Sequence, residues 1–134
     1  MEEIIMGLDM YLDAVNRNND SGTVKVYYWR KANSIHNWIL KETGTPSDFN
    51  VNDNDIELTK DMLIKFVEQA ETVLKDKSDE TSERLIPSCS GFFFGSTEYD
   101  EWYYEDIKDT AEKFKELINT FDFENYNLLY SCWW

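Results

Sequence analysis

Two short segments of the sequence hold most of the residue types that bind ligands. The first runs from position 27 to position 38 and sets aromatic rings beside two adjacent bases. Its candidate ligand contacts are Tyr28, Trp29, Arg30, Lys31, Asn33 and His36. We expect a strand to end and a helix to begin here, and backbone N–H groups at such a junction attract anions. Arg30 can grip a carboxylate or a phosphate while a neighbouring ring stacks on a planar ligand. The same residues also suit a purely structural junction of packed rings and extended basic side chains.

The second segment spans positions 88–104, where glycines bracket three phenylalanines and hydroxyl residues follow. Its candidate ligand contacts are Gly95, Ser96, Thr97, Glu98, Tyr99 and Trp102. Backbone amides between Gly95 and Glu98 suit an anion, although the GxxxxGK[ST] pattern of a phosphate loop is absent. Glu98 and Asp100 would repel a highly charged phosphate. The simpler interpretation is helix capping, with Thr97 as the N-cap and Asp100 as the third residue of the helix.

The sequence makes a weaker case for catalysis or for a metal. His36 is the sole histidine, and it borders an expected buried helix face, which suits a structural, hydrogen-bonded histidine at least as well as an acid or base. Asp9, Glu98 and Asp100 are candidates for acid–base work, but their spacing does not bring them together. Cys89 and Cys132 are interpreted as two reduced, partly buried thiols. We therefore assign no catalytic residue, no metal ligand and no cofactor.

The first half of the chain predicts a β-hairpin followed by a helix. Gly7–Val15 alternates in hydrophobicity, and Thr23–Trp29 is rich in β-branched and aromatic residues, so the two form an antiparallel pair. From Lys31 the apolar spacing becomes helical, and Gly44 ends that helix. A polar connection covers positions 46–57, with a short strand expected at Asp55–Leu58.

The second half predicts two helices and two strands. Thr59 is the expected N-cap of a helix that continues through Lys75, and a charged loop follows at 76–90. We expect a buried strand at 91–95, a helix after Thr97 and a last strand at 127–134. Together these elements predict a single α+β domain spanning 1–134, with an antiparallel or mixed sheet of about four to five strands and about three helices on one face.

Charge narrows the range of partners. The chain has 134 residues and a formal net charge of −14. Almost all of that excess lies after position 45, and a surface of that kind repels nucleic acid. It suits solubility, a basic protein partner or competition for a site that normally holds nucleic acid. No stretch has the features of a signal peptide or a membrane span, so we expect a cytoplasmic protein that does not bind membranes.

Three sequence blocks resemble a group of small phage and prophage proteins that have no settled biochemical function. The blocks are Gly-Leu-Asp-Met-Tyr-Leu at 7–12, Tyr-Trp-Arg-Lys-Ala-Asn-Ser-Ile-His-Asn-Trp at 28–38, and Ser-Gly-Phe-Phe-Phe-Gly-Ser-Thr-Glu-Tyr-Asp-Glu-Trp-Tyr at 90–103. The resemblance covers about a quarter of the chain. It implies a phage accessory role inside a bacterial host, and it supplies no catalytic residues.

Three functions are compatible with these observations. The leading hypothesis is a binding protein with an anti-defence role that holds a small aromatic or anionic ligand such as a nucleotide without turning it over. It requires that the stretch around Arg30 and the stretch around Ser96 line one cleft. The first alternative is an acidic inhibitor that imitates nucleic acid and blocks a basic host nuclease or CRISPR effector. The second is a nucleotide hydrolase that uses Asp9, His36, Glu98 or Asp100. A homo-oligomer is compatible with each of them.

Overall fold

A four-stranded antiparallel sheet forms one layer of the protein. The computed structural model describes residues 7–18, 22–45, 55–89 and 97–133. Strand β1 (Asp9–Asn16) is central and pairs with β2 (Thr23–Arg30) on one side and with β4 (Tyr126–Trp133) on the other. The two-residue strand β3 (Ile56–Glu57) completes the order β2-β1-β4-β3. The predicted hairpin, the short third strand and the last strand are confirmed.

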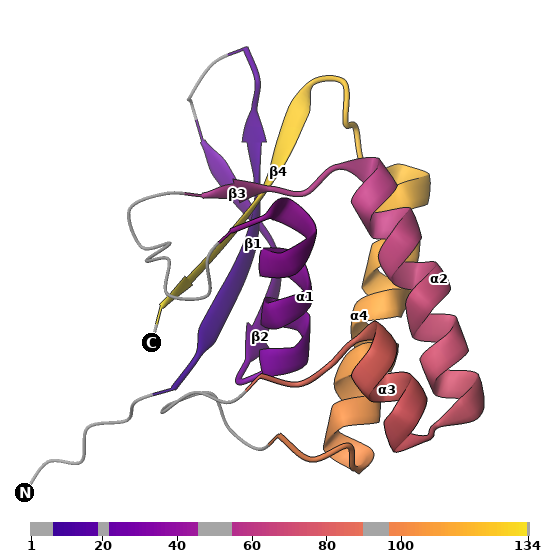
Figure 1. Cartoon of the computed structure of the whole chain (residues 1–134). Coiled ribbons are helices and arrows are strands. Elements are labelled where there is room, and N and C mark those ends of the chain that lie inside the picture. The colour runs from indigo at the N-terminus through magenta and orange to yellow at the C-terminus, as the bar shows by residue number, and fades with distance from the viewer. Residues whose placement is uncertain (1–6, 19–21, 46–54, 90–96, 134) are drawn as a thin grey trace, which may run out of the picture.

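The helices lie on one side of this sheet (Figure 1). Along β1, Met10, Leu12 and Ala14 are buried, whereas Asp9 and Tyr11, which point the other way, are only half-buried. This alternation is typical of a sheet that covers a core with one face only. The predicted α+β class is therefore confirmed, with four helices rather than about three.

Local signals explain where two of the helices begin and end. Helix α1 (Asn33–Thr43) ends at Gly44, whose φ of 69° lies in the left-handed region that glycine adopts without strain. Helix α2 (Lys60–Asp76) begins after Thr59, whose hydroxyl accepts a hydrogen bond from the backbone N–H of Met62 at 3.2 Å, as predicted. It packs lengthwise against helix α4 (Glu101–Thr120) (Figure 1).

Two predictions about the second half were wrong. Part of the expected loop at 76–90 is helix α3 (Asp79–Leu85), which Ser78 caps by accepting a hydrogen bond from the Thr81 N–H. Only one residue within the bounds of α3, Ser82, is buried, so the sequence of this helix needs no apolar stripe and shows none. Helix α4 begins after Asp100 and not after Thr97, because the Asp100 carboxylate accepts the Tyr103 N–H at 3.1 Å.

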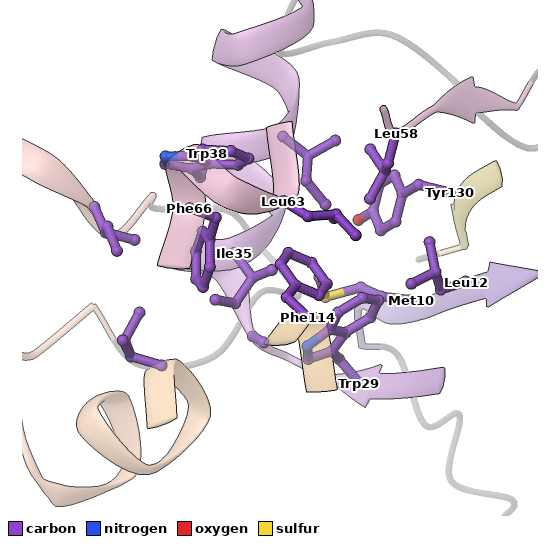
Figure 2. Close-up of a cluster of buried hydrophobic side chains, with 14 of the residues drawn as sticks. Met10, Leu12, Trp29, Ile35, Trp38, Leu58, Leu63, Phe66, Phe114 and Tyr130 are labelled. Atoms are coloured by element: carbon purple, nitrogen blue, oxygen red, sulfur yellow. The ribbon is translucent and has the colours of Figure 1, made fainter. Parts of the chain in front are cut away.

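Aromatic rings from every layer meet in the core (Figure 2). The rings of Phe66 and Phe114 lie 5.2 Å apart, and Trp29 meets Phe114 edge-on at 6.4 Å. Buried polar contacts fix the orientation of the indoles, since Trp29 donates to the Thr110 hydroxyl at 2.7 Å and Trp38 donates to Gln69 at the same distance. Much of the high aromatic content therefore stabilises the core.

Two further features concern membranes and the expected fifth strand. None of the helices formed by the described residues combines the length and the apolar character that a membrane span needs. The strand predicted at 91–95 lies outside the described residues.

Candidate functional site

A hollow lies between the β2–α1 junction and the start of α4. Its volume is about 290 Å³, close to the lower end of the range usual for small-molecule sites. Its described lining residues are Arg30, Lys31, Asn33, Ser34, Glu98, Asp100, Trp102, Tyr103 and Asp106. Segments more than sixty positions apart in the sequence thus line one hollow.

The basic side of the hollow is held by the edge of the sheet. Arg30 forms an ion pair with Asp9 at 2.9 Å, and the Tyr28 hydroxyl donates to the same carboxylate at 2.6 Å. Lys31 donates its backbone N–H to the carbonyl of Leu8 at 2.6 Å. Its φ is 57°, a left-handed conformation that costs a lysine energy. The bonded carbonyl and this φ fix the backbone from which both basic side chains extend.

Gly7 leaves room for these two basic side chains. A methyl group at this position would come within 2.8 Å of the Lys31 Cε and 3.1 Å of an Arg30 guanidinium nitrogen. Any larger residue would therefore displace the Lys31 side chain.

Helix α1 directs an uncompensated N-terminus into the same hollow. Ala32 occupies the N-cap position, makes no side-chain cap hydrogen bond, and is followed by a first turn without acidic residues. The positive end of the helix is thus not balanced within its own helix. Ser34, in the first turn, is only 4% exposed and lines the hollow. Its hydroxyl makes no hydrogen bond to another described residue.

The opposite side of the hollow, built by the start of α4, is aromatic and acidic. Trp102 is 79% exposed, an unusual position for so large an apolar ring. Asp100 is engaged in capping the helix. Asp106 is half-buried and, within the described ranges, takes part in no ion pair or side-chain hydrogen bond. Burial first, and then the negative charges of Asp109, Glu105 and Asp100, raise the pKa of Asp106 to about 6.

The structure brings together five of the predicted site residues, and these lie on both predicted segments. They are Arg30, Lys31, Asn33, Glu98 and Trp102. The Asn33 side-chain oxygen accepts the Cys89 N–H at 3.0 Å, which ties the beginning of the second segment to α1.

Trp29 and His36 lie elsewhere, and their assignment as ligand contacts is corrected. Trp29 is 5% exposed and His36 is 1% exposed, so both belong to the core. The His36 ring nitrogen Nδ1 lies 2.6 Å from the Tyr130 hydroxyl, and burial lowers the pKa of His36 to about 4. Both rings pack against apolar residues of the sheet and the helices. The sequence of one segment does not reveal this packing, because it depends on the tertiary fold.

Three other predicted contacts stay outside the hollow. Tyr28 stands on the uncovered face of the sheet, where its ring lies 5.5 Å from that of Tyr11. Tyr99 donates its hydroxyl to Glu83 at 2.9 Å and supports the loop before α4. Thr97 precedes the helix that it was expected to cap, and its carbonyl accepts the Ser88 hydroxyl at 2.7 Å. Gly95 and Ser96 lie outside the described residues.

Sequence reasoning did not single out three residues of the hollow, Ser34, Tyr103 and Asp106. Ser34 was hidden inside the basic and aromatic segment, although a hydroxyl in the first turn of a helix without a capping side chain was a usable signal. Asp106 gave no such signal, because its burial depends on how α4 packs against the β2–α1 junction.

A larger hollow of about 570 Å³ lies on the other side of Trp102. Lys77 and Lys108 line it together with Asp100, Glu101 and Glu105. The Lys77 ammonium stands 5.7 Å from the centre of the Tyr104 ring, so this cation already has an aromatic partner. The larger hollow lacks two adjacent bases, and the helix N-terminus that lines it, that of α4, is capped by Asp100 and carries Glu101 in its first turn. We therefore place the candidate site in the smaller hollow.

The structure also bears on metal and thiol chemistry. Among residues 7–18, 22–45, 55–89 and 97–133, no three His, Cys, Asp or Glu side chains form a group able to hold a metal ion. Cys89 and Cys132 are not joined by a disulfide. Burial raises the pKa of Cys89 and raises that of Cys132 to about 12, so neither is an activated nucleophile.

Comparison with known proteins identifies no relative. No family model matches the chain, and searches of curated proteins and of solved structures find no match either. The resemblance to small phage proteins stays a prediction, and any functional proposal depends on the hollow itself.

Proposed function

We propose that this chain is a non-enzymatic binding protein that holds a small planar ligand with an anionic group, of the nucleotide kind, in the smaller hollow. One observation carries the proposal: the exposed ring of Trp102 stands beside the same hollow as Arg30, Lys31 and the N-terminus of α1. Stacking on an aromatic ring and charge-assisted contacts to a phosphate are the usual means of holding a nucleotide.

The positions of the candidate catalytic groups favour binding over hydrolysis. Asp9 is engaged by Arg30 and Tyr28 on the sheet, and His36 is buried against Tyr130. Only Glu98 and Asp100 of the four candidate groups line the hollow. The four candidate groups are thus not gathered around one ligand position.

The biological setting of this binding is proposed on weaker grounds. The three sequence blocks that resemble phage proteins support an anti-defence accessory role in the cytoplasm of a bacterial host. Sequestration of a nucleotide signal is one way in which a protein without turnover could serve that role.

Titration calorimetry with nucleoside monophosphates tests the binding proposal. We expect saturable binding to the wild-type protein, and recovery of the nucleotide unchanged after prolonged incubation. Trp102→Ala should weaken binding by about tenfold or more, because stacking on an aromatic ring contributes roughly 1–3 kcal/mol per base.

Trp133→Ala is the matched control for that variant. Trp133 is also exposed, at 59%, but it lies on β4 and does not line the hollow. Its replacement should leave the affinity unchanged. Absence of heat for every nucleotide at millimolar concentration, or equal losses in the two variants, would refute the proposal.

A second candidate function, inhibition of a basic protein, is favoured by one feature of α4. Five exposed acids recur along it at helical spacing and therefore share one stripe: Glu101, Glu105, Asp109, Glu112 and Glu116. Neighbours along the stripe are about 5–6 Å apart along the helix axis, a spacing comparable to that of successive phosphates. Such a stripe can imitate a nucleic acid strand.

Charge reversal separates the two functions. Replacing Glu105, Asp109 and Glu112 by lysine should abolish capture of a basic nuclease if α4 is the contact surface, while nucleotide binding in the hollow persists. Retention of the capture would exclude α4 as the binding surface.

A further inference from the structure

The two ends of the smaller hollow differ in charge, and this difference limits which nucleotide fits. One end is the β2–α1 junction, which contributes the bases Arg30 and Lys31, and the other is the start of α4 with the residues before it, which contribute Glu98, Asp100 and Asp106. A ligand that is anionic throughout would meet carboxylates at the second end. A ligand that is cationic throughout would meet the bases at the first. The hollow therefore suits a molecule with one anionic group and, at its far end, hydrogen-bond donors.

The anionic group belongs at α1. The N-terminus of this helix has neither a capping side chain nor an acidic residue in its first turn. Ser34 supplies an independent sign of an acceptor, because the residue is only 4% exposed and lines the hollow, and its hydroxyl makes no hydrogen bond to another described residue. A phosphate there would accept from the hydroxyl and face Lys31.

The donors belong at Asp106. Asp100 is occupied with the Tyr103 N–H, and Glu98 is exposed, whereas Asp106 is half-buried and, among the described residues, has no ion-pair or hydrogen-bond partner. A half-buried carboxylate gains most from a ligand that brings it donors. Among bases that stack on an indole, guanine offers two adjacent N–H donors, N1–H and N2–H, whereas adenine offers an acceptor at the matching ring nitrogen.

We infer that the ligand is a purine nucleoside monophosphate of the guanine type, with its phosphate at the N-terminus of α1, its base on Trp102 and the N1–H and N2–H edge on Asp106. This inference rests on the proposed function. It assigns the selectivity for guanine over adenine to the carboxylate of Asp106. A second or third phosphate is disfavoured, because the hollow offers only Arg30, which Asp9 partly neutralises, and Lys31.

The test compares the affinities of guanosine, inosine and adenosine monophosphates by calorimetry at pH 7.5. Guanosine monophosphate should bind at least about tenfold more tightly than adenosine monophosphate, a ratio that corresponds to about 1.4 kcal/mol. Inosine monophosphate, which keeps N1–H and lacks the N2 amine, should lie between them. Equal affinities for all three would overturn the inference while leaving the proposed function standing; absence of any binding would remove both.

Two variants assign the two ends. Asp106→Asn should reduce the preference for guanosine over adenosine monophosphate by about tenfold, since a neutral amide presents only one acceptor. Ser34→Ala should weaken both nucleotides by a similar factor and leave their ratio unchanged. Neither variant threatens the fold, because Asp106 forms no described pair and Ser34 no described hydrogen bond.

Glu112→Gln is the matched control. It removes one negative charge from the same helix at an exposed position that does not line the hollow. The guanosine preference should survive this change. A preference that persists in Asp106→Asn, or that falls equally in Glu112→Gln, would show that general charge and not the Asp106 carboxylate selects the base.

Discussion

Lys31 combines an unfavourable backbone conformation with a place in the candidate site. Its φ of 57° costs a residue with a Cβ roughly 1–2 kcal/mol. Lys77 has a similar φ of 52°, but it occupies a helix C-cap, where this conformation is common. Strained residues of this kind concentrate at functional sites. The conformation of Lys77 is therefore explained by its place at a helix end, whereas that of Lys31 is explained by its place in the candidate site.

Glycine at either position should relieve the strain. We expect Lys31→Gly and Lys77→Gly each to keep or raise the free energy of unfolding, by up to about 1 kcal/mol. Only Lys31→Gly should weaken nucleotide binding, because only Lys31 lines the smaller hollow. Urea denaturation and calorimetry on both variants measure the two effects. Loss of stability in Lys31→Gly without loss of affinity would assign Lys31 a structural role alone.

Two titratable groups, the buried His36 and the half-buried Asp106, give the free energy of unfolding opposite dependences on pH. The folded pKa of His36 is about 4, below its usual 6.5, so the unfolded chain takes up a proton first and stability is lost as the pH falls from 6.5 to 4. The folded pKa of Asp106 is about 6, above its usual 3.8, so the folded chain takes up a proton first. Stability is gained as the pH falls from 6 to 3.8. The full effect of His36 is on the order of 3 kcal/mol.

The variant Asp106→Asn should remove the contribution of Asp106 to the pH dependence of stability and leave that of His36. At pH 7.5 the variant should be more stable than the wild type by on the order of 1 kcal/mol, a value reduced for the partial solvent exposure of the carboxyl. The advantage should shrink below pH 6 and vanish near pH 4, and the acid-induced loss of stability should become steeper. Urea titrations across this range measure it. A difference that does not vary with pH would contradict the burial of the Asp106 charge.

At the scale of the elements, capping decides where α4 begins. Asp100 and Thr97 both have the side-chain chemistry of an N-cap, and the sequence pattern favoured Thr97. The structure selects Asp100, which places Trp102 in the first turn and directs it toward the hollow. The choice is therefore also functional.

A pair of alanine substitutions tests this assignment. Asp100→Ala should lower the free energy of unfolding by about 1 kcal/mol, because the Tyr103 N–H loses its acceptor. Thr97→Ala should change it by less than about 0.5 kcal/mol, since Thr97 is exposed and contributes only its backbone carbonyl to a described hydrogen bond. Equal losses in a denaturation series would restore the capping role of Thr97.

The elements with strong periodicity were predictable from the sequence, and those with weak periodicity were not. The β1–β2 alternation and the broad apolar face of α2 predicted their elements to within a few residues. Helix α3 was missed because it buries only Ser82 within its bounds, so its sequence reads as a charged loop. Short helices of this kind depend on a cap and on tertiary packing rather than on an apolar stripe.

The candidate site was predictable only in part, for a related reason. Residue type and spacing were enough to single out Arg30, Lys31 and Trp102, and these three line one hollow. Ser96, around which the second wall of the cleft was expected, lies outside the described residues. The sequence alone did not show that Trp29 and His36 point into the core. Which face of the end of β2 is buried, and which face of α1, depends on the elements that pack against them. The burial of Asp106 likewise follows from tertiary packing.

At the scale of the whole molecule, the formal net charge of −14 opposes folding through mutual repulsion. Burial first, and then Asp109, Asp106 and Glu112, raise the pKa of the Tyr27 phenol, which shows how far the negative field of α4 extends. Added salt screens such repulsion over about 10 Å at 0.1 M.

Salt should therefore stabilise this protein. We expect the urea midpoint to rise between 0.05 M and 0.5 M NaCl, and the rise to be smaller in the double variant Glu105→Gln, Asp109→Asn. The two replaced acids are both exposed, so their neutralisation leaves the core intact. A midpoint that is independent of salt would show that the acids are dispersed too widely to interact.

The most direct test of the central claim follows the indole N–H signals of the five tryptophans by NMR during titration with guanosine monophosphate. Trp102→Phe and Trp133→Phe assign the signals of the two tryptophans that are exposed in the described part of the chain. The account predicts that the Trp102 signal shifts and saturates, while the signals of the buried Trp29 and Trp38 and of Trp133, which does not line the hollow, stay in place. A saturable shift at Trp133 instead, or no shift at any indole, would contradict a ligand site at the hollow between β2, α1 and α4.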